Sequence, residues 1–186
     1  MNQRVRTYSV SEITTMTKSI AILFAVATAV LLPQAVHQGG RLFGVGTGIG
    51  EMLLPMHFSI LLLGLLAGPY AGAIAGLVAP LISFALTGMP TSVMLPYITI
   101  ELFSYGMAAG LVADTKLPTV VKVLVAQVAG RAVRAVFILF GVYALGSNVP
   151  VAIIWTSITA GIVGIVLQLI LLPMLVRAAE AGKWLK

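Results

Sequence analysis

Apolar residues run along the chain in six long stretches, separated by short breaks of glycine, proline or charged residues. A helix that crosses a bilayer needs about 20 mostly apolar residues, within a range of about 17–25. With the breaks as boundaries, the pattern predicts six helices, over residues of about 18–35, 52–67, 70–88, 93–113, 118–145 and 151–178. The pattern is therefore typical of an all-α integral membrane protein built as a bundle of six transmembrane helices.

The first 17 residues are polar and predict a leader or a short amphipathic helix ahead of the first apolar stretch. A cleaved signal peptide over residues 1–35 is the alternative. It is disfavoured because the polar lead-in is long and no small-residue cleavage site follows the apolar part. We expect one membrane domain over residues 1–186.

Composition agrees with this class, since 60% of the residues are hydrophobic and only 9% are charged. Soluble domains have about 45–50% apolar and about 25% charged residues. The chain has no cysteine, which excludes disulfides and thiolate metal sites. His37 and His57 are not at metal-ligand spacing. The sequence thus predicts no metal site and no cofactor.

Basic residues are distributed unevenly between the two sides of the predicted membrane. With the N-terminus inside, eight Lys and Arg fall on the inner side, and the outer loops carry only Arg41. The eight are Arg4, Arg6, Lys18, Lys116, Lys122, Arg177, Lys183 and Lys186. Because cytoplasmic loops are enriched in Lys and Arg, this bias predicts that both termini are cytoplasmic. It also explains most of the net charge of +6 without any nucleic-acid partner.

Arg131 and Arg134 remain, and both lie inside the fifth apolar stretch. At about 1.5 Å per residue, Arg131 is about 20 Å from the inner end of its helix, and Glu101 is about 12 Å from the outer end of the fourth. The two levels are similar, and Glu101 is the only acidic residue inside any segment. Because an unpaired charge in a membrane is unfavourable, we predict a buried Glu101–Arg131 or Glu101–Arg134 pair.

One arginine is then left without a carboxylate. It either extends to the outer interface, for which Arg134 is near enough, or it faces an outward-open cavity. In a cavity its guanidinium would bind a ligand carboxylate or phosphate by a forked hydrogen bond.

Other polar and aromatic side chains in the outer half are candidates for ligand binding. His57 shares the level of Glu101, although a lone histidine is more often a packing residue. Tyr97, Tyr105 and Trp155 are either interfacial belt residues or stack on a planar ligand ring. Asn148, between the last two segments, is the remaining candidate.

Small residues recur at four-residue spacing, which allows close helix packing. Ala21, Ala25 and Ala29 form such a stripe, which serves either packing within the bundle or the docking of a partner helix. Gln127 and Gln168 predict hydrogen bonds between helices. The glycine-rich stretch over residues 39–50 is either a flexible loop or a mobile lid over an outer cavity.

The stretches "LPMHFSILLLGLLAGPYAGAIAGLVAPLISFALTGMP" and "ELFSYGMAAGL", with the small-residue first helix and the glycine-rich first outer loop, resemble a known family. They are similar to the substrate-binding S-components of energy-coupling factor (ECF) vitamin transporters. The resemblance covers nearly the whole chain, and its most specific part is residues 53–110.

The resemblance implies a mechanism and partners. An S-component captures a vitamin from outside in a pocket built from outer loops and the outer halves of helices four to six. It then associates with a membrane coupling subunit and two cytoplasmic ATPases, which drive its reorientation and inward delivery of the vitamin. In this chain the docking surface would be the stripe of Ala21, Ala25 and Ala29. A G-x-x-x-x-G-K-[ST] segment is missing, so the chain is not itself the ATPase.

The ligand class follows less directly. A spare positive charge favours an acid such as pantothenate, whereas Tyr97, Tyr105 and Trp155 would suit a pyrimidine, a pyridoxine-like compound or a benzimidazole nucleoside. Two other classes compete. In an autonomous ion-coupled transporter, Glu101 would be the proton or cation site. An intramembrane enzyme is disfavoured because the sequence lacks G-x-S-x-G, H-E-x-x-H and paired intramembrane carboxylates.

Overall fold

The computed structural model describes residues 10, 13–42, 44 and 48–182, and every regular element within these residues is a helix. The predicted leader lies mostly outside the described residues, as does part of the glycine-rich loop. The eight helices are α1 (Thr15–Leu42), α2 (Gly48–Leu53), α3 (Pro55–Ala67), α4 (Pro69–Thr87), α5 (Leu95–Ala113), α6 (Thr119–Leu145), α7 (Ile153–Ala160) and α8 (Ile162–Gly182).

Five of these helices are long and apolar enough to cross a membrane, namely α1, α4, α5, α6 and α8. The apolar α3 has only 13 residues, which is below the usual length of a spanning helix. The chain is therefore an all-helical, multi-pass membrane protein. The count of six transmembrane helices and the cytoplasmic termini stay predictions.

Three predicted segments differ from the observed helices. The first continues through Pro33 to Leu42 instead of ending near residue 35, as membrane helices tolerate proline. The second is divided at Leu54, whose φ of 50° is left-handed, and Pro55 then begins α3. The last is interrupted at Gly161, between α7 and α8.

Glycines bring α4 and α5 close together, as the small-residue pattern predicted. A Cβ on Gly106 would lie 2.1 Å from the carbonyl oxygen of Gly72, and one on Gly76 would lie 2.2 Å from that of Leu102. Gly64 of α3 approaches α5 in the same way, because a Cβ on Gly64 would lie 2.6 Å from the carbonyl oxygen of Gly106. Any side chain at these positions would separate the helices.

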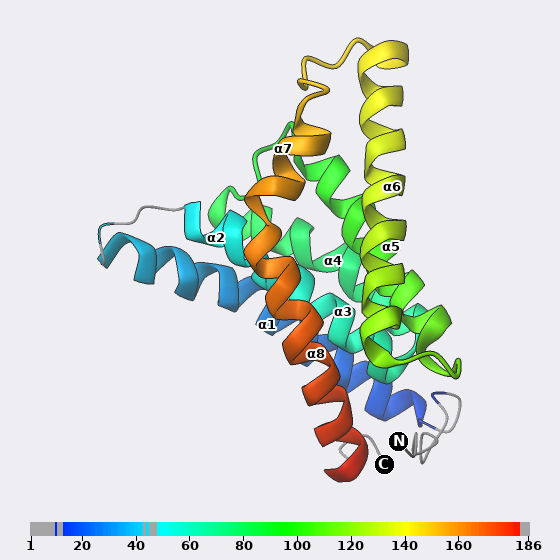
Figure 1. Ribbon diagram of the computed structural model, residues 1–186. Helices are drawn as coiled ribbons and strands as arrows, with labels where there is room; N and C mark the ends of the chain where they lie inside the picture. The colour runs from blue at the N-terminus through cyan, green and yellow to red at the C-terminus, as the bar shows by residue number, and fades with distance from the viewer. Residues whose placement is uncertain (1–9, 11–12, 43, 45–47, 183–186) are drawn as a thin grey trace.

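The antiparallel helices α5 and α6, which run alongside each other in Figure 1, pair in a fixed register. The Tyr105 ring lies against Gly130, where a Cβ would be only 2.5 Å from the ring. Four residues toward the start of α5 and four toward the end of α6, Glu101 lies opposite Arg134, and their side chains form an ion pair at 2.9 Å. Four residues further, Tyr97 packs with Ile138. This register determines which arginine reaches Glu101.

The start of α1 and the end of α8 lie at one end of the bundle, and the connection from α6 to α7 lies at the other (Figure 1). Within the bundle, Gln127 Nε2 donates to Gln168 Oε1 at 2.8 Å. The predicted hydrogen bond between α6 and α8 is confirmed. Gln168 Nε2 also donates to the Leu54 carbonyl oxygen at 3.3 Å, which ties α8 to the junction between α2 and α3.

The alanine stripe of α1 faces the interior rather than the surface. Ala29 is fully buried and Ala25 is 7% exposed, and Ala21 packs against the same core. A partner helix cannot contact Ala25 or Ala29 without opening this core. This burial favours the packing interpretation of Ala21, Ala25 and Ala29, and their role as a docking surface stays a prediction.

Candidate ligand-binding site

A cavity of about 480 Å³ opens between α1, α3, α5, α6, α7 and the loop that joins α4 to α5. The parts that line it include the second half of α1, the start of α3, the first half of α5, the middle of α6, and α7. The cavity thus lies toward the end of the bundle opposite the start of α1 and the end of α8. Its volume falls within the range of about 300–1,000 Å³ that is usual for small-molecule sites.

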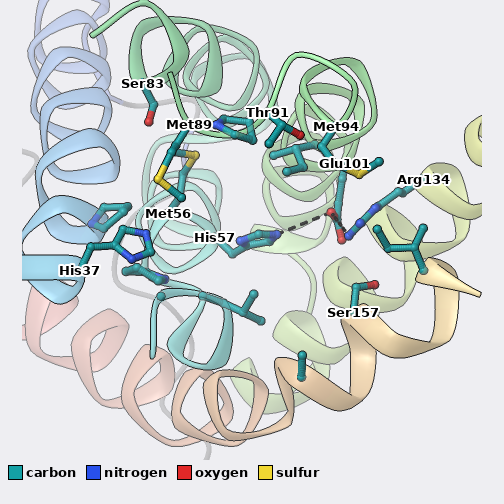
Figure 2. Close-up of a pocket in the computed structure, with 18 of the residues that line it drawn as sticks. His37, Met56, His57, Ser83, Met89, Thr91, Met94, Glu101, Arg134 and Ser157 are labelled. Atoms are coloured by element: carbon teal, nitrogen blue, oxygen red, sulfur yellow. Dashed lines mark hydrogen bonds and ion pairs between the residues drawn. The ribbon is translucent and has the colours of Figure 1, made fainter. Parts of the chain in front are cut away.

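Glu101 is the centre of the polar wall of this cavity. Its side chain is 1% exposed, and its Oε2 accepts a hydrogen bond from Arg134 Nη1 at 2.9 Å. The other carboxylate oxygen, Oε1, accepts one from the Tyr105 hydroxyl at 3.1 Å. His57 Nε2 lies 3.7 Å from Oε2. Figure 2 shows His57 and Arg134 approaching the carboxylate from opposite sides.

The structure thus selects Arg134 as the partner of Glu101. The alternative that Arg134 extends to the outer interface is wrong, because its side chain is only 12% exposed and its guanidinium bonds to Glu101. Its Nε is buried without a hydrogen-bond partner. Glu101 balances one positive charge of this wall.

Arg131 is the remaining arginine, and it too lines the cavity. Its guanidinium carbon lies 5.8 Å from the centre of the Tyr105 ring, within the range of a cation–π contact. Among the described residues no carboxylate lies within salt-bridge distance of it. As far as the structure describes the chain, the cavity wall therefore carries a guanidinium without a counter-ion.

His57 connects the two halves of this cluster. Its ring packs edge-on against Tyr105, with 5.3 Å between the ring centres, while its Nε2 points toward Glu101. His57 also lines the cavity. Both predicted possibilities for His57, packing and contact with a ligand, are thus compatible with its position.

Comparison with family models gives one match: residues 13–176 match the family described as "ECF transporter, substrate-specific component". The match spans nearly all of the described helices. The chain belongs to this family. It is a substrate-specific component of an ECF transporter and thus a transport protein. Searches among curated proteins and among solved structures returned no significant match.

The structure does not bring every predicted residue of this S-component to the cavity. Trp155 is 70% exposed on α7, and Asn148 is exposed in the connection from α6 to α7. Tyr97 donates a hydrogen bond to Ser147 at 3.1 Å and lines a separate groove of about 210 Å³ with residues of α6. Tyr105 is buried behind Glu101. None of the four lines the cavity, so direct ligand stacking by Tyr97, Tyr105 or Trp155 lacks support from the structure.

The S-component's cavity also includes residues that sequence reasoning missed. Gln34 and His37 line it from α1, because this helix continues beyond Pro33. Their spacing of three residues places them on one helical face, a signal that would have been visible had the first helix been extended. Met56, Met89 and Met94 supply much of its apolar surface. Within the described residues the lining contains no Phe, Tyr or Trp.

Proposed function

We propose that this S-component is the high-affinity capture subunit of an ECF-type importer for a small, water-soluble vitamin or vitamin precursor that carries an anionic group. The observation that supports this most is Arg131, a guanidinium that lines the cavity while Glu101 bonds to Arg134. A ligand carboxylate or phosphate would supply the missing counter-ion. An arginine forms such contacts by two parallel hydrogen bonds, which fixes orientation as well as charge.

The lining favours an aliphatic acid over an aromatic compound. Among the described lining residues, Arg131 and Arg134 face a single carboxylate, and the apolar part consists of methionine, proline and aliphatic side chains. A pantothenate-like acid is therefore our first candidate. Pyrimidine, pyridoxine-like and benzimidazole-nucleoside ligands remain in the test panel, because methionine side chains also pack against rings.

We further propose that the chain resides in the plasma membrane of a prokaryotic cell as a six-helix bundle with both termini cytoplasmic. The cavity lies toward the end of the bundle opposite the start of α1 and the end of α8. Cytoplasmic termini would thus turn its opening to the outside, where an importer must capture its substrate. Partners of the family type, a membrane coupling subunit and two cytoplasmic ATPases, would then drive reorientation and inward delivery.

The alternative of an autonomous ion-coupled transporter would need Glu101 to exchange a proton or a cation. Glu101 is instead surrounded by Arg134, Tyr105 and His57. Such a carboxylate is suited to holding neighbouring side chains in place. The geometry therefore favours a fixed scaffold role for Glu101.

The test is calorimetric titration of the purified protein in detergent with pantothenate, pyridoxine, thiamin, a benzimidazole nucleoside and the uncharged alcohol pantothenol. Calorimetry is preferable to tryptophan fluorescence because Trp155 lies away from the cavity. We expect tight binding of pantothenate and weak binding of pantothenol. Arg131→Gln should weaken anion binding roughly 10- to 100-fold, since hydrogen bonds to charged groups contribute about 1.5–3 kcal/mol.

Arg177→Gln is the matched control, because Arg177 is exposed near the end of α8. It removes the same charge far from the cavity and should leave affinity unchanged. Equal affinity of wild type and Arg131→Gln for every anion that binds would refute the assignment of Arg131 to the ligand.

A further inference from the structure

The second half of α1 forms a wall of the cavity, with Pro33, Gln34 and His37 in its lining. Figure 2 shows His37 on the side of the cavity opposite Arg134, with His57 between them. The arginine side is charged, whereas the α1 side contributes no formal charge when His37 is neutral. The cavity is therefore polar at two separated places of different chemical character.

The imidazole of His37 is held in place by packing rather than by hydrogen bonds. A Cβ on Gly50 would lie 2.2 Å from His37 Cε1 and 2.7 Å from its Nε2, so the ring lies directly against Gly50 and a side chain there would have to displace it. His37 Nδ1 is buried and has no hydrogen-bond partner. Among the described residues, Nε2 also has no hydrogen-bond partner, but unlike Nδ1 it is not buried. Nε2 is thus the ring nitrogen that remains accessible.

This difference determines which nitrogen holds the proton in neutral His37. A neutral imidazole has one N–H donor and one bare acceptor nitrogen. Leaving a buried N–H unpaired is unfavourable, and orphaned donors are rarer in proteins than under-satisfied acceptors. The stable arrangement keeps Nδ1 bare and protonates Nε2. His37 then presents an N–H donor at its accessible edge.

We propose that His37, assisted by Gln34, is a second recognition point that donates a hydrogen bond from Nε2–H to an uncharged oxygen of the ligand. This inference rests on the proposed function and narrows its ligand class. The ligand is a non-aromatic organic anion whose charged group binds Arg131 and whose other end carries a hydroxyl or carbonyl oxygen. Gln34 lies one helical turn before His37 on the same face and supplies an amide that can donate or accept.

The first test reads the tautomer directly. The chain contains only two histidines, so the protein labelled with 15N-histidine in detergent gives two imidazole spin systems, and His37→Phe assigns them. At neutral pH we expect His37 to show a protonated Nε2 and a bare Nδ1. A protonated Nδ1 or an imidazolium would overturn the proposal, whatever the ligand is.

The second test measures pantothenate affinity by calorimetry for the wild type, His37→Phe and His37→Gln. Loss of one hydrogen bond should weaken binding about 3- to 10-fold in His37→Phe. His37→Gln keeps an N–H donor and should recover part of the loss. Circular dichroism and thermal unfolding of each variant show that the fold is retained.

The outcomes separate this inference from the function on which it rests. Wild-type affinity in His37→Phe, together with weak binding in Arg131→Gln, would overturn the role of His37 and leave the proposed function intact. If the wild-type protein does not bind pantothenate, that ligand is excluded, and the tautomer spectrum still decides whether His37 presents a donor.

Discussion

Replacement of Glu101 by glutamine removes the one carboxylate that the described residues contribute to the cavity wall. Its oxygens accept hydrogen bonds from Arg134 at 2.9 Å and from Tyr105 at 3.1 Å. The variant would leave two guanidiniums, those of Arg131 and Arg134, in a wall with no counter-ion among the described residues. Breaking a buried ion pair from one side destabilises a protein by about 3–5 kcal/mol. We expect Glu101→Gln to reach the upper part of this range.

Arg134→Gln should be less severe. The Glu101 carboxylate would keep its hydrogen bond from Tyr105, and His57 Nε2 would still lie 3.7 Å from its Oε2. Arg134 has no comparable reserve, because its Nε is already buried without a partner. The predicted order of stability is thus wild type, Arg134→Gln, then Glu101→Gln.

The double variant isolates the interaction between the two side chains. Reversible unfolding in mixed micelles, followed by circular dichroism across an SDS titration, gives the free energy of unfolding of each protein. We expect the double variant to be less destabilised than the sum of the single variants, with a coupling of about 0.5–3 kcal/mol. Additivity within about 0.3–0.5 kcal/mol would mean that the pair does not contribute, and the reasoning from the observed distance would fail.

Three further outcomes are expected. Gly106→Ala should destabilise the bundle by about 1–3 kcal/mol or more in thermal unfolding, because the new Cβ meets the Gly72 carbonyl oxygen. A Cβ on Gly39 would have nothing within 4 Å, so Gly39→Ala should be neutral or stabilising. Equal losses of stability in Gly106→Ala and Gly39→Ala would contradict the packing argument. Ala25→Trp should lower folded yield, ligand binding and uptake together, unlike Leu23→Trp at an exposed position. Selective loss of uptake would instead support the docking role of the stripe. Dissipating the proton gradient at constant ATP should spare uptake in cells, whereas prompt loss would favour an ion-coupled transporter.

The class of all-helical, multi-pass membrane protein was predictable from the sequence, because it depends on the length and hydrophobicity of the apolar stretches. The charge inventory also predicted that Glu101 pairs with an arginine. The sequence could not decide between Arg131 and Arg134, because estimates of depth along a helix carry errors of about one turn. The contact of Tyr105 with Gly130 fixes the register, and that contact is a property of two packed helices.

The aromatic candidates illustrate a second limit. Depth in the membrane is shared by all faces of a helix, so the level of Trp155 gave no information about its direction. It is directed outward, while its neighbours Thr156 and Ser157 line the cavity. His37 was missed for a different reason. The first helix was predicted to end near residue 35, shortly after Pro33, whereas α1 continues to Leu42.

The way in which the cavity is assembled has a thermodynamic consequence. Its lining comes from segments as distant in sequence as Gln34, His57, Arg131 and Ser157, so a bound molecule would act as a reversible cross-link between helices. A ligand that binds only the folded protein, at 100 times its dissociation constant, adds about 2.7 kcal/mol to the free energy of unfolding. The ligand-free protein is then less stable than the ligand-bound one, and resistance to heat or protease becomes a direct measure of ligand occupancy.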